Sequence, residues 1–228
     1  MNMFSFSLTK LTSNLKSVVI RFPLALFFSL VSTILLVIKI QTDSDIIFLD
    51  RAILISILSV ILFTTISLFI EKRIDKLLYK IIFYAIGIIF VIIYLFIFLK
   101  SMQELVLMRY IVFIISIFFT IIFVGFLGLK DENNFELFSV KLFLRFFVTI
   151  LFSGILFAGL SSAIATIDFL FAINFTEKVY FNLFVIVSGI FSIPYFLMGI
   201  PDKNYSYEEV DYPKVLKILI AYIFLPLV

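Results

Sequence analysis

Several residue types with a distinctive chemistry are missing from this sequence of 228 residues. It contains no Cys, no His and no Trp, and only 14% of its residues are charged. Without Cys and His there are no disulfides, no thiolate or imidazole metal ligands, and no Cys or His nucleophile or general base. The sequence also holds no Gly-rich phosphate loop and no Gly-x-Ser-x-Gly nucleophile motif. These absences leave enzymatic activity open but argue against it, and they predict no metal and no cofactor.

Apolar residues dominate what is present. They make up 64% of the sequence, and the mean hydropathy is +1.26, whereas a soluble domain is about half apolar. A membrane core of about 30 Å is crossed by a helix of about 20 apolar residues, and such a helix satisfies every backbone N–H and C=O within its own segment. We therefore predict an all-α, polytopic transmembrane helix bundle with six full spans and a truncated seventh. The expected full spans are Phe22–Ile38, Ala52–Ile70, Ile81–Leu99, Tyr110–Leu129, Phe146–Ile167 and Tyr180–Ile200, and the seventh is Val215–Val228.

The Lys and Arg residues are distributed unevenly between the two ends of these spans. Thirteen lie in the N-terminal segment and in the second, fourth and sixth loops, whereas five lie in the first, third and fifth loops. Because positively charged residues are retained on the cytoplasmic side, this asymmetry predicts a cytoplasmic N-terminus. The basic residues border the spans and form no basic domain, so we expect no nucleic-acid partner. We expect a multi-pass protein of a bacterial inner membrane.

Two regions are expected along the chain. Residues 1–21 are too polar to span a membrane, but their apolar side chains recur at helical spacing. This pattern predicts a cytoplasmic amphipathic leader in contact with membrane lipids. Residues 22–228 are expected to form the transmembrane helical domain. Its last segment, Val215–Val228, would be only about 21 Å long as a helix, so the sequence predicts that this domain is incomplete at its C-terminus.

The span Phe146–Ile167 is richer in small residues than its neighbours. Gly154, Ala158 and Ser162 are spaced four residues apart and therefore share one helix face. Small side chains let helix backbones approach closely, which favours helix–helix packing in a membrane. We therefore predict that this helix lies at the centre of the bundle, and other membrane proteins are candidate partners. In the alternative interpretation a small-residue face lines a cavity, and Ser153, Ser161 and Ser162 then face a substrate.

Asp168 follows this face and has apolar neighbours on both sides. Placing a carboxylate within a membrane costs free energy, so such a residue usually has a function. A proton relay or a coupling-ion site is therefore one hypothesis for Asp168. The span has already used about 22 residues by Ile167, which favours a position at the outer interface. In that interpretation the partner of Asp168 would be Lys178, Asn174 or Asn182.

The span Tyr180–Ile200 contains a proline and a polar residue at membrane depth. Pro194 lacks a backbone N–H, so we expect a kink, a free carbonyl near Ile190 and a hinge. Interrupted helices of this kind form binding sites in transporters, although they also occur in structural bundles. Asn182 is, with Asp168 and Ser162, a candidate for substrate binding.

A resemblance to a known family covers most of the chain. It is carried by the stretches RFPLALFFSLVSTILL, LFSGILFAGLSSAIATIDFLFAINFTEKVYFNLFVIVSGIFSIPYFLMGIP and YPKVLKILIAYIFLPLV. These stretches resemble the N-terminal part of bacterial multi-pass membrane proteins grouped as domain of unknown function 4153. The resemblance implies a multi-pass membrane protein, and it brings no established activity, substrate or site residues. Proteins of this family are longer, which implies that the chain continues beyond its last helix.

Three functions remain open from the sequence. The first is a transporter-like or permease-like protein, and the second is a non-transporting membrane scaffold that assembles or regulates a partner. The third is the N-terminal membrane part of a lipid-modifying enzyme. Charged residues are scarce within the spans, which argues against transport coupled to protons or ions. A neutral or lipidic substrate, or no substrate, fits this scarcity better.

Overall fold

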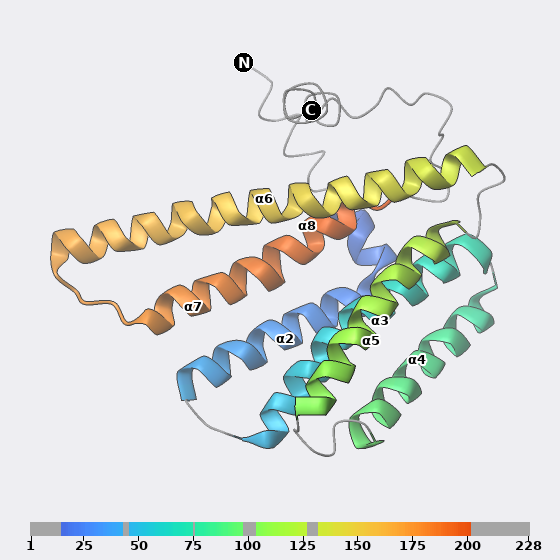
Figure 1. The fold of residues 1–228 in the computed structure, drawn as a ribbon, viewed down its shortest axis with the longest axis horizontal. Helices are drawn as coiled ribbons and strands as arrows, with labels where there is room; N and C mark the ends of the chain where they lie inside the picture. Colours follow the sequence, from blue (N-terminus) through green and yellow to red (C-terminus); the bar gives the residue numbers. More distant parts are fainter. Residues whose placement is uncertain (1–14, 43–45, 75, 98–103, 127–131, 202–228) are drawn as a thin grey trace.

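The computed structural model describes residues 15–42, 46–74, 76–97, 104–126 and 132–201. Within these ranges all regular secondary structure is helical, which confirms the predicted all-α fold. Figure 1 shows the arrangement of the elements. They are α2 (Pro23–Thr42), α3 (Ile47–Arg73), α4 (Leu77–Ile97), α5 (Glu104–Phe126), α6 (Glu132–Phe171), α7 (Glu177–Ile186), the π-helical segment η1 (Val187–Ser192) and α8 (Ile193–Met198).

Six of the described segments are long and apolar enough to cross a membrane, as the sequence predicts. The last of them, Glu177–Met198, is one continuous helix made of α7, η1 and α8. The largest difference from the expected boundaries is in α6, which has 40 residues and extends well before Phe146. The predicted seventh span, Val215–Val228, lies outside the described residues.

The predicted leader is described only in part, because residues 1–14 lie outside the described ranges. Residues 15–21 are helical and lead directly into α2. Val18 is 1% exposed and Phe22 is not exposed at all, so both side chains belong to the core of the bundle. This end of the leader therefore packs against the transmembrane helices.

Helix α3 is the central helix of the bundle. More than half of its span is buried, against less than a quarter of each of the other five spans. It packs against α2, α4 and α5. Its buried face carries small hydroxyl residues that return a hydrogen bond to their own helix, among them Ser59 to Ile55 O (2.7 Å) and Thr64 to Val60 O (2.7 Å). Such compact side chains let the neighbouring backbones come close.

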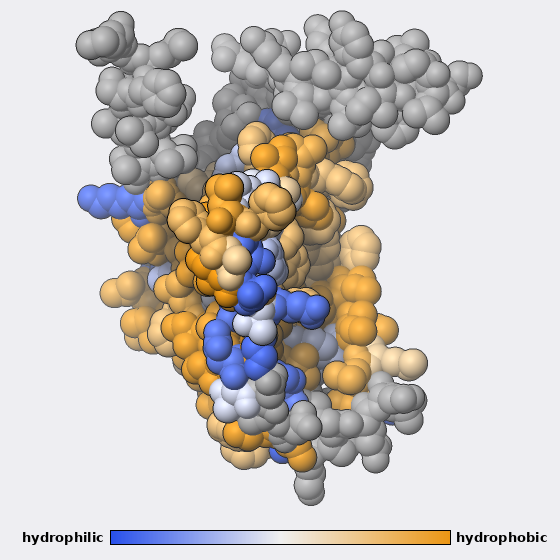
Figure 2. All heavy atoms as spheres, turned by 90° about the vertical axis from the view of Figure 1, so that its left-hand side faces the viewer, coloured by the Kyte–Doolittle hydropathy of each residue, from blue (hydrophilic) through white to orange (hydrophobic). Residues whose placement is uncertain are grey.

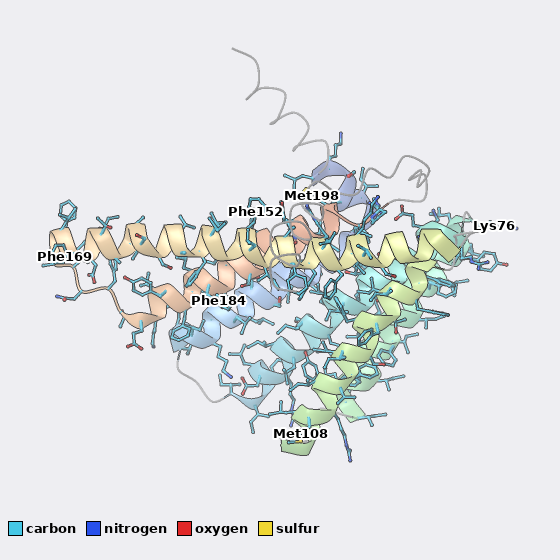
Figure 3. The ribbon with its side chains drawn as sticks, turned by 45° about the horizontal axis from the view of Figure 1, so that its top comes forward. Lys76, Met108, Phe152, Phe169, Phe184 and Met198 are labelled. Carbon is cyan, nitrogen blue, oxygen red and sulfur yellow. The ribbon has the colours of Figure 1, made fainter. Side chains whose placement is uncertain are left out.

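The prediction that the small-residue helix lies at the centre is wrong for the described residues. In α6 only 11% of the span is buried. Ala158 and Ser162 are exposed, and a Cβ added to Gly154 would meet no atom within 4 Å. Small residues permit a close approach but do not produce one, and here α6 and α7 project from the other helices so that Phe169, at the end of α6, is 88% exposed (Figure 3). Packing of this face against another molecule stays a prediction.

Polar contacts join the helix ends on the side where the sequence places the cytoplasm. Nε of Arg21 donates to Glu71 (3.0 Å) at the end of α3, and Nη1 of Arg21 donates to Ile200 O (3.1 Å) just beyond α8. The ammonium of Lys72 lies 4.7 Å from the ring centroid of Phe138 in α6. The start of α2 and the ends of α3 and α8 therefore share one side, as the alternating topology requires.

Figure 2 looks onto the opposite side of the molecule, where the α6–α7 turn lies. Hydrophilic residues gather along this end, and the flanks around it are hydrophobic. Lys39 at the end of α2 forms an ion pair with Asp50 at the start of α3. A polar end between apolar flanks is the pattern expected of a membrane protein at a water boundary.

Candidate functional site

A cavity of about 550 Å³ lies between the central helices and the α6–α8 arm. Pockets that bind small molecules have volumes of roughly 300–1,000 Å³, so it is large enough for a ligand. Figure 1 shows that the end of α5 and the start of α6 are neighbours and that the two helices diverge from there. Residues of both helices line the cavity. The lining residues are Ser32 of α2; Ile57, Val60, Ile61 and Thr64 of α3; Phe118 and Ile121 of α5; Phe146, Thr149, Ile150, Ser153, Gly154 and Phe157 of α6; Phe184 of α7; Val187, Ser188 and Ser192 of η1; and Ile193, Phe196 and Leu197 of α8.

Aromatic residues flank the cavity along α6. Nearer the start of α6, the ring of Phe146 lies 5.8 Å from that of Phe118 and 6.4 Å from that of Phe196. Three turns further along α6, the ring of Phe157 meets that of Phe184 edge to face at 5.6 Å. Edge-to-face rings at these separations attract one another. The cavity thus lies between two aromatic layers that come from different helices.

The polar groups of the lining are hydroxyls, and most of their protons are already engaged. Ser32 donates to Ser29 O (2.9 Å), and Thr149 donates to Arg145 O (2.7 Å). Thr64 likewise bonds within α3. No lining residue carries a charge. A ligand in the cavity therefore meets an apolar surface with few available donors.

The π-helical segment η1 forms one wall and packs closely against α2. The hydroxyl of Ser29 donates to Gly189 O (2.6 Å), a buried bond between the two helices. A Cβ at position 189 would lie 1.8 Å from Oγ1 of Thr33, so only a glycine fits this contact. On the other side of η1, the hydroxyls of Ser192 and Ser153 of α6 are hydrogen-bonded to each other (2.7 Å). The segment η1 thus bridges α2 and α6 across the cavity.

The irregular turn of η1 lies directly before Pro194, where the sequence predicts a kink. A π-turn widens the helix and leaves backbone carbonyls without their usual i+4 donor. Ser192 also donates to Val187 O (3.0 Å), which satisfies one such carbonyl with a side chain. The predicted position of the irregularity therefore agrees with the structure, although the carbonyl that bonds to another helix belongs to Gly189 and not to Ile190. A hinge motion at Pro194 stays a prediction.

Arg145 holds the C-terminal end of α8 in place. Its Nε donates to Tyr195 O (3.2 Å), and its guanidinium carbon lies 4.0 Å from the centroid of the Tyr195 ring. The carbonyls in the last turn of a helix lack intrahelical donors and carry a partial negative charge. The cation therefore caps the end of α8 and holds it against α6.

The three substrate-binding candidates from the sequence do not line the cavity. Asp168 accepts a hydrogen bond from the backbone N–H of Phe175 (2.9 Å). It thereby stabilises the α6–α7 turn, in which Ala172 and Asn174 have positive φ angles of 48° and 60°. This backbone partner was not among those expected for Asp168. The structure thus gives this carboxylate a structural role.

The other two candidates also lie apart from the cavity. Ser162 is exposed, and its carbonyl accepts a hydrogen bond from Thr166 (2.8 Å) within α6. Oδ1 of Asn182 is buried without a hydrogen-bond partner among the described residues. Sequence reasoning missed Ser32, Thr64 and Thr149, whose only signal is a hydroxyl within an apolar span. Across the described ranges, no three Asp or Glu side chains gather closely enough to hold a metal ion.

No family model, no curated protein and no solved structure matches the chain. The resemblance to the domain of unknown function 4153 therefore stays an expectation.

Proposed function

We propose that this protein is a permease-like carrier of a bacterial inner membrane that moves a neutral molecule through the cavity. The observation that carries the proposal is an uncharged cavity of about 550 Å³ that is lined by five of the six apolar spans. A permease needs such a chamber at membrane depth, because its substrate must leave one side before it reaches the other. The uncharged lining selects against ions, for which entry would be unfavourable.

The flanking aromatic layers and the bridge through η1 favour a carrier that changes conformation rather than a rigid binding pocket. Each layer joins α6 to another element, so a small rotation of α6 opens one layer while the other stays closed. The segment η1 is suited to absorb such a rotation, because π-turns and prolines interrupt the regular bonding of a helix. A hydrogen bond between the hydroxyls of Ser153 and Ser192 links it to α6.

A cavity-blocking variant tests this proposal. Gly154 lines the cavity, and a Cβ added there would meet no atom within 4 Å, so Gly154→Phe introduces a ring beside the cavity. The matched control is Ile155→Phe on the same helix, because Ile155 is 61% exposed and does not line the cavity. Purified protein in vesicles is assayed for uptake of glycerol and for exchange of a fluorescent phosphatidylcholine between leaflets.

The expected result is that at least one probe moves faster than in protein-free vesicles. Gly154→Phe should abolish this movement, whereas Ile155→Phe should leave it unchanged. If neither probe moves, or if both variants behave like the unaltered protein, the permease proposal is wrong. The two probes also separate a water-soluble substrate from a lipid.

The scaffold hypothesis is favoured by a different observation, the exposed small-residue face of α6. Ala158 and Ser162 lie on this face, are exposed and do not line the cavity. Because the sequence contains no Cys, Ser162→Cys introduces the only thiol, and Ser116→Cys on the exposed side of α5 is its control. A scaffold predicts that Ser162→Cys alone, labelled with benzophenone maleimide and irradiated in native membranes, gives cross-linked adducts with its partner, and Ala158→Leu should remove them. Equal adducts at both positions, or none, would contradict it.

A further inference from the structure

The chemistry of the cavity wall restricts what can occupy it. Six of the lining residues are Ser or Thr, but Ser32, Thr64, Thr149 and Ser192 donate to backbone carbonyls. Ser192 is also bonded to the hydroxyl of Ser153. A sugar or another polyol has many hydroxyls and could replace only some of the hydrogen bonds that it gives up to water, which is unfavourable. A hydrocarbon loses nothing on entering, because its surface matches the apolar wall.

The exposure of the lining residues shows where a ligand enters. Deep in the cavity, Ile121 is 2% exposed and Leu197 is 1% exposed. On the α6 and α7 side, Ile150 and Phe184 are each 54% exposed, and Phe146 is 39% exposed. These exposed residues lie within membrane-spanning segments. The mouth of the cavity therefore faces the hydrocarbon of the bilayer, where acyl chains are the surrounding molecules.

We infer that the cavity is a binding site for a lipid acyl chain that enters sideways from the bilayer. The inference rests on the proposed function in so far as the same cavity is the binding chamber. A chain between the two aromatic layers contacts α3 and α5 on one side and α6 on the other. The charged or zwitterionic headgroup stays outside, because the wall offers no charge and few donors to it.

Tryptophan fluorescence tests this inference directly, since the sequence contains no Trp and one introduced indole is the only one. Phe118 lines the cavity, its neighbour Phe119 is 63% exposed, and Phe63 in the core is not exposed at all. The variants Phe118→Trp, Phe119→Trp and Phe63→Trp are reconstituted in phosphatidylcholine vesicles. Half of the vesicles contain phosphatidylcholine brominated on its acyl chains, which quenches a nearby indole.

Phe119→Trp is expected to lose most of its emission in the brominated vesicles, and Phe63→Trp to keep most of it. Phe118→Trp should resemble Phe119→Trp. Adding Gly154→Phe should then restore the emission of Phe118→Trp but leave that of Phe119→Trp quenched. Phe157 also lines the cavity. Phe157→Trp therefore provides a second reporter if circular dichroism shows that Phe118→Trp is not folded.

Emission of Phe118→Trp equal to that of Phe63→Trp would overturn the inference, whether the cavity is closed or occupied by another part of the chain. Quenching of Phe118→Trp that Gly154→Phe does not relieve would overturn it as well. A separate arm adds brominated stearate to unbrominated vesicles and distinguishes a free fatty acid from a phospholipid chain. Quenching without transport would support the acyl-chain site and contradict the permease proposal. Transport without quenching would support the permease proposal and contradict the acyl-chain site.

Discussion

The contact between η1 and α2 leads to the sharpest prediction for stability. Gly189→Ala adds one methyl group to a position where it would lie 1.8 Å from Oγ1 and 3.1 Å from Cβ of Thr33. Gly154→Ala adds the same group to open space, with no atom within 4 Å. The two substitutions are identical in chemistry and both lie within membrane helices. We expect them to change stability in opposite directions.

The expected magnitude follows from the contacts that the methyl group disturbs. The hydroxyl of Thr33 must move and then loses its hydrogen bond to Ser29 O (2.8 Å), a loss of about 1 kcal/mol. The overpacking that remains between η1 and α2 adds about 1–3 kcal/mol. Gly189→Ala should therefore destabilise the protein by about 2–4 kcal/mol. Gly154→Ala should be neutral or stabilise it by up to about 1 kcal/mol, because alanine favours the helix.

Thermal unfolding in detergent, followed by far-UV circular dichroism, measures both effects. For a chain of this size, Gly189→Ala should lower Tm by roughly 5–15 °C. The variant Thr33→Ala removes the clashing oxygen, so the double variant should be at least about 1 kcal/mol more stable than the sum of the single effects. Equal melting of Gly189→Ala and Gly154→Ala, or strict additivity with Thr33→Ala, would refute the close contact between η1 and α2.

Three further predictions concern the ends of the helices. Arg145→Lys keeps the charge but loses the planar group that stacks on a tyrosine ring and bonds its carbonyl, so we expect about 1–3 kcal/mol of destabilisation in the same assay. Asp168→Ala should expose the α6–α7 turn to limited proteolysis, whereas Asp168→Asn keeps an acceptor for the amide of Phe175 and should be milder; a transport defect equal in both would revive the proton-relay hypothesis. Reporter fusions after residues 76 and 134 should be cytoplasmic and those after 104 and 175 periplasmic, and two reversed results would exclude the predicted topology.

The helices themselves could be predicted from the sequence, because hydropathy over about 20 residues is a local property. Their ends were less predictable, since a helix continues into water as long as its residues allow it. Helix α6 shows this clearly: its apolar part begins near Phe146, but the helix begins at Glu132. The alternation of Lys and Arg supplied the topology independently of the boundaries.

The packing and the cavity could not be predicted in the same way. The spacing of Gly154, Ala158 and Ser162 marks a face on which close approach is possible, but α6 projects from the other helices and leaves most of this face exposed. The close approach occurs instead at Gly189, a single glycine without a spacing motif. Which of two glycines meets a neighbour depends on how the helices are rotated against one another. That information is spread over residues far apart in the sequence, such as Thr33 and Gly189.

The divergence of α6 from α5 has a consequence for the membrane itself. With 40 residues, α6 is about 60 Å long, which is about twice the hydrocarbon thickness. The end of α5 lies near the start of α6, and the two helices diverge from there (Figure 1). One bilayer thickness must therefore suit two helices that cross it at different tilts. Long helices adapt to a thinner bilayer by tilting further, which changes the angle between α6 and α5. Because the cavity lies between α5 and α6, its width should change with the thickness of the surrounding membrane. Ligand binding in the cavity would then depend on that thickness.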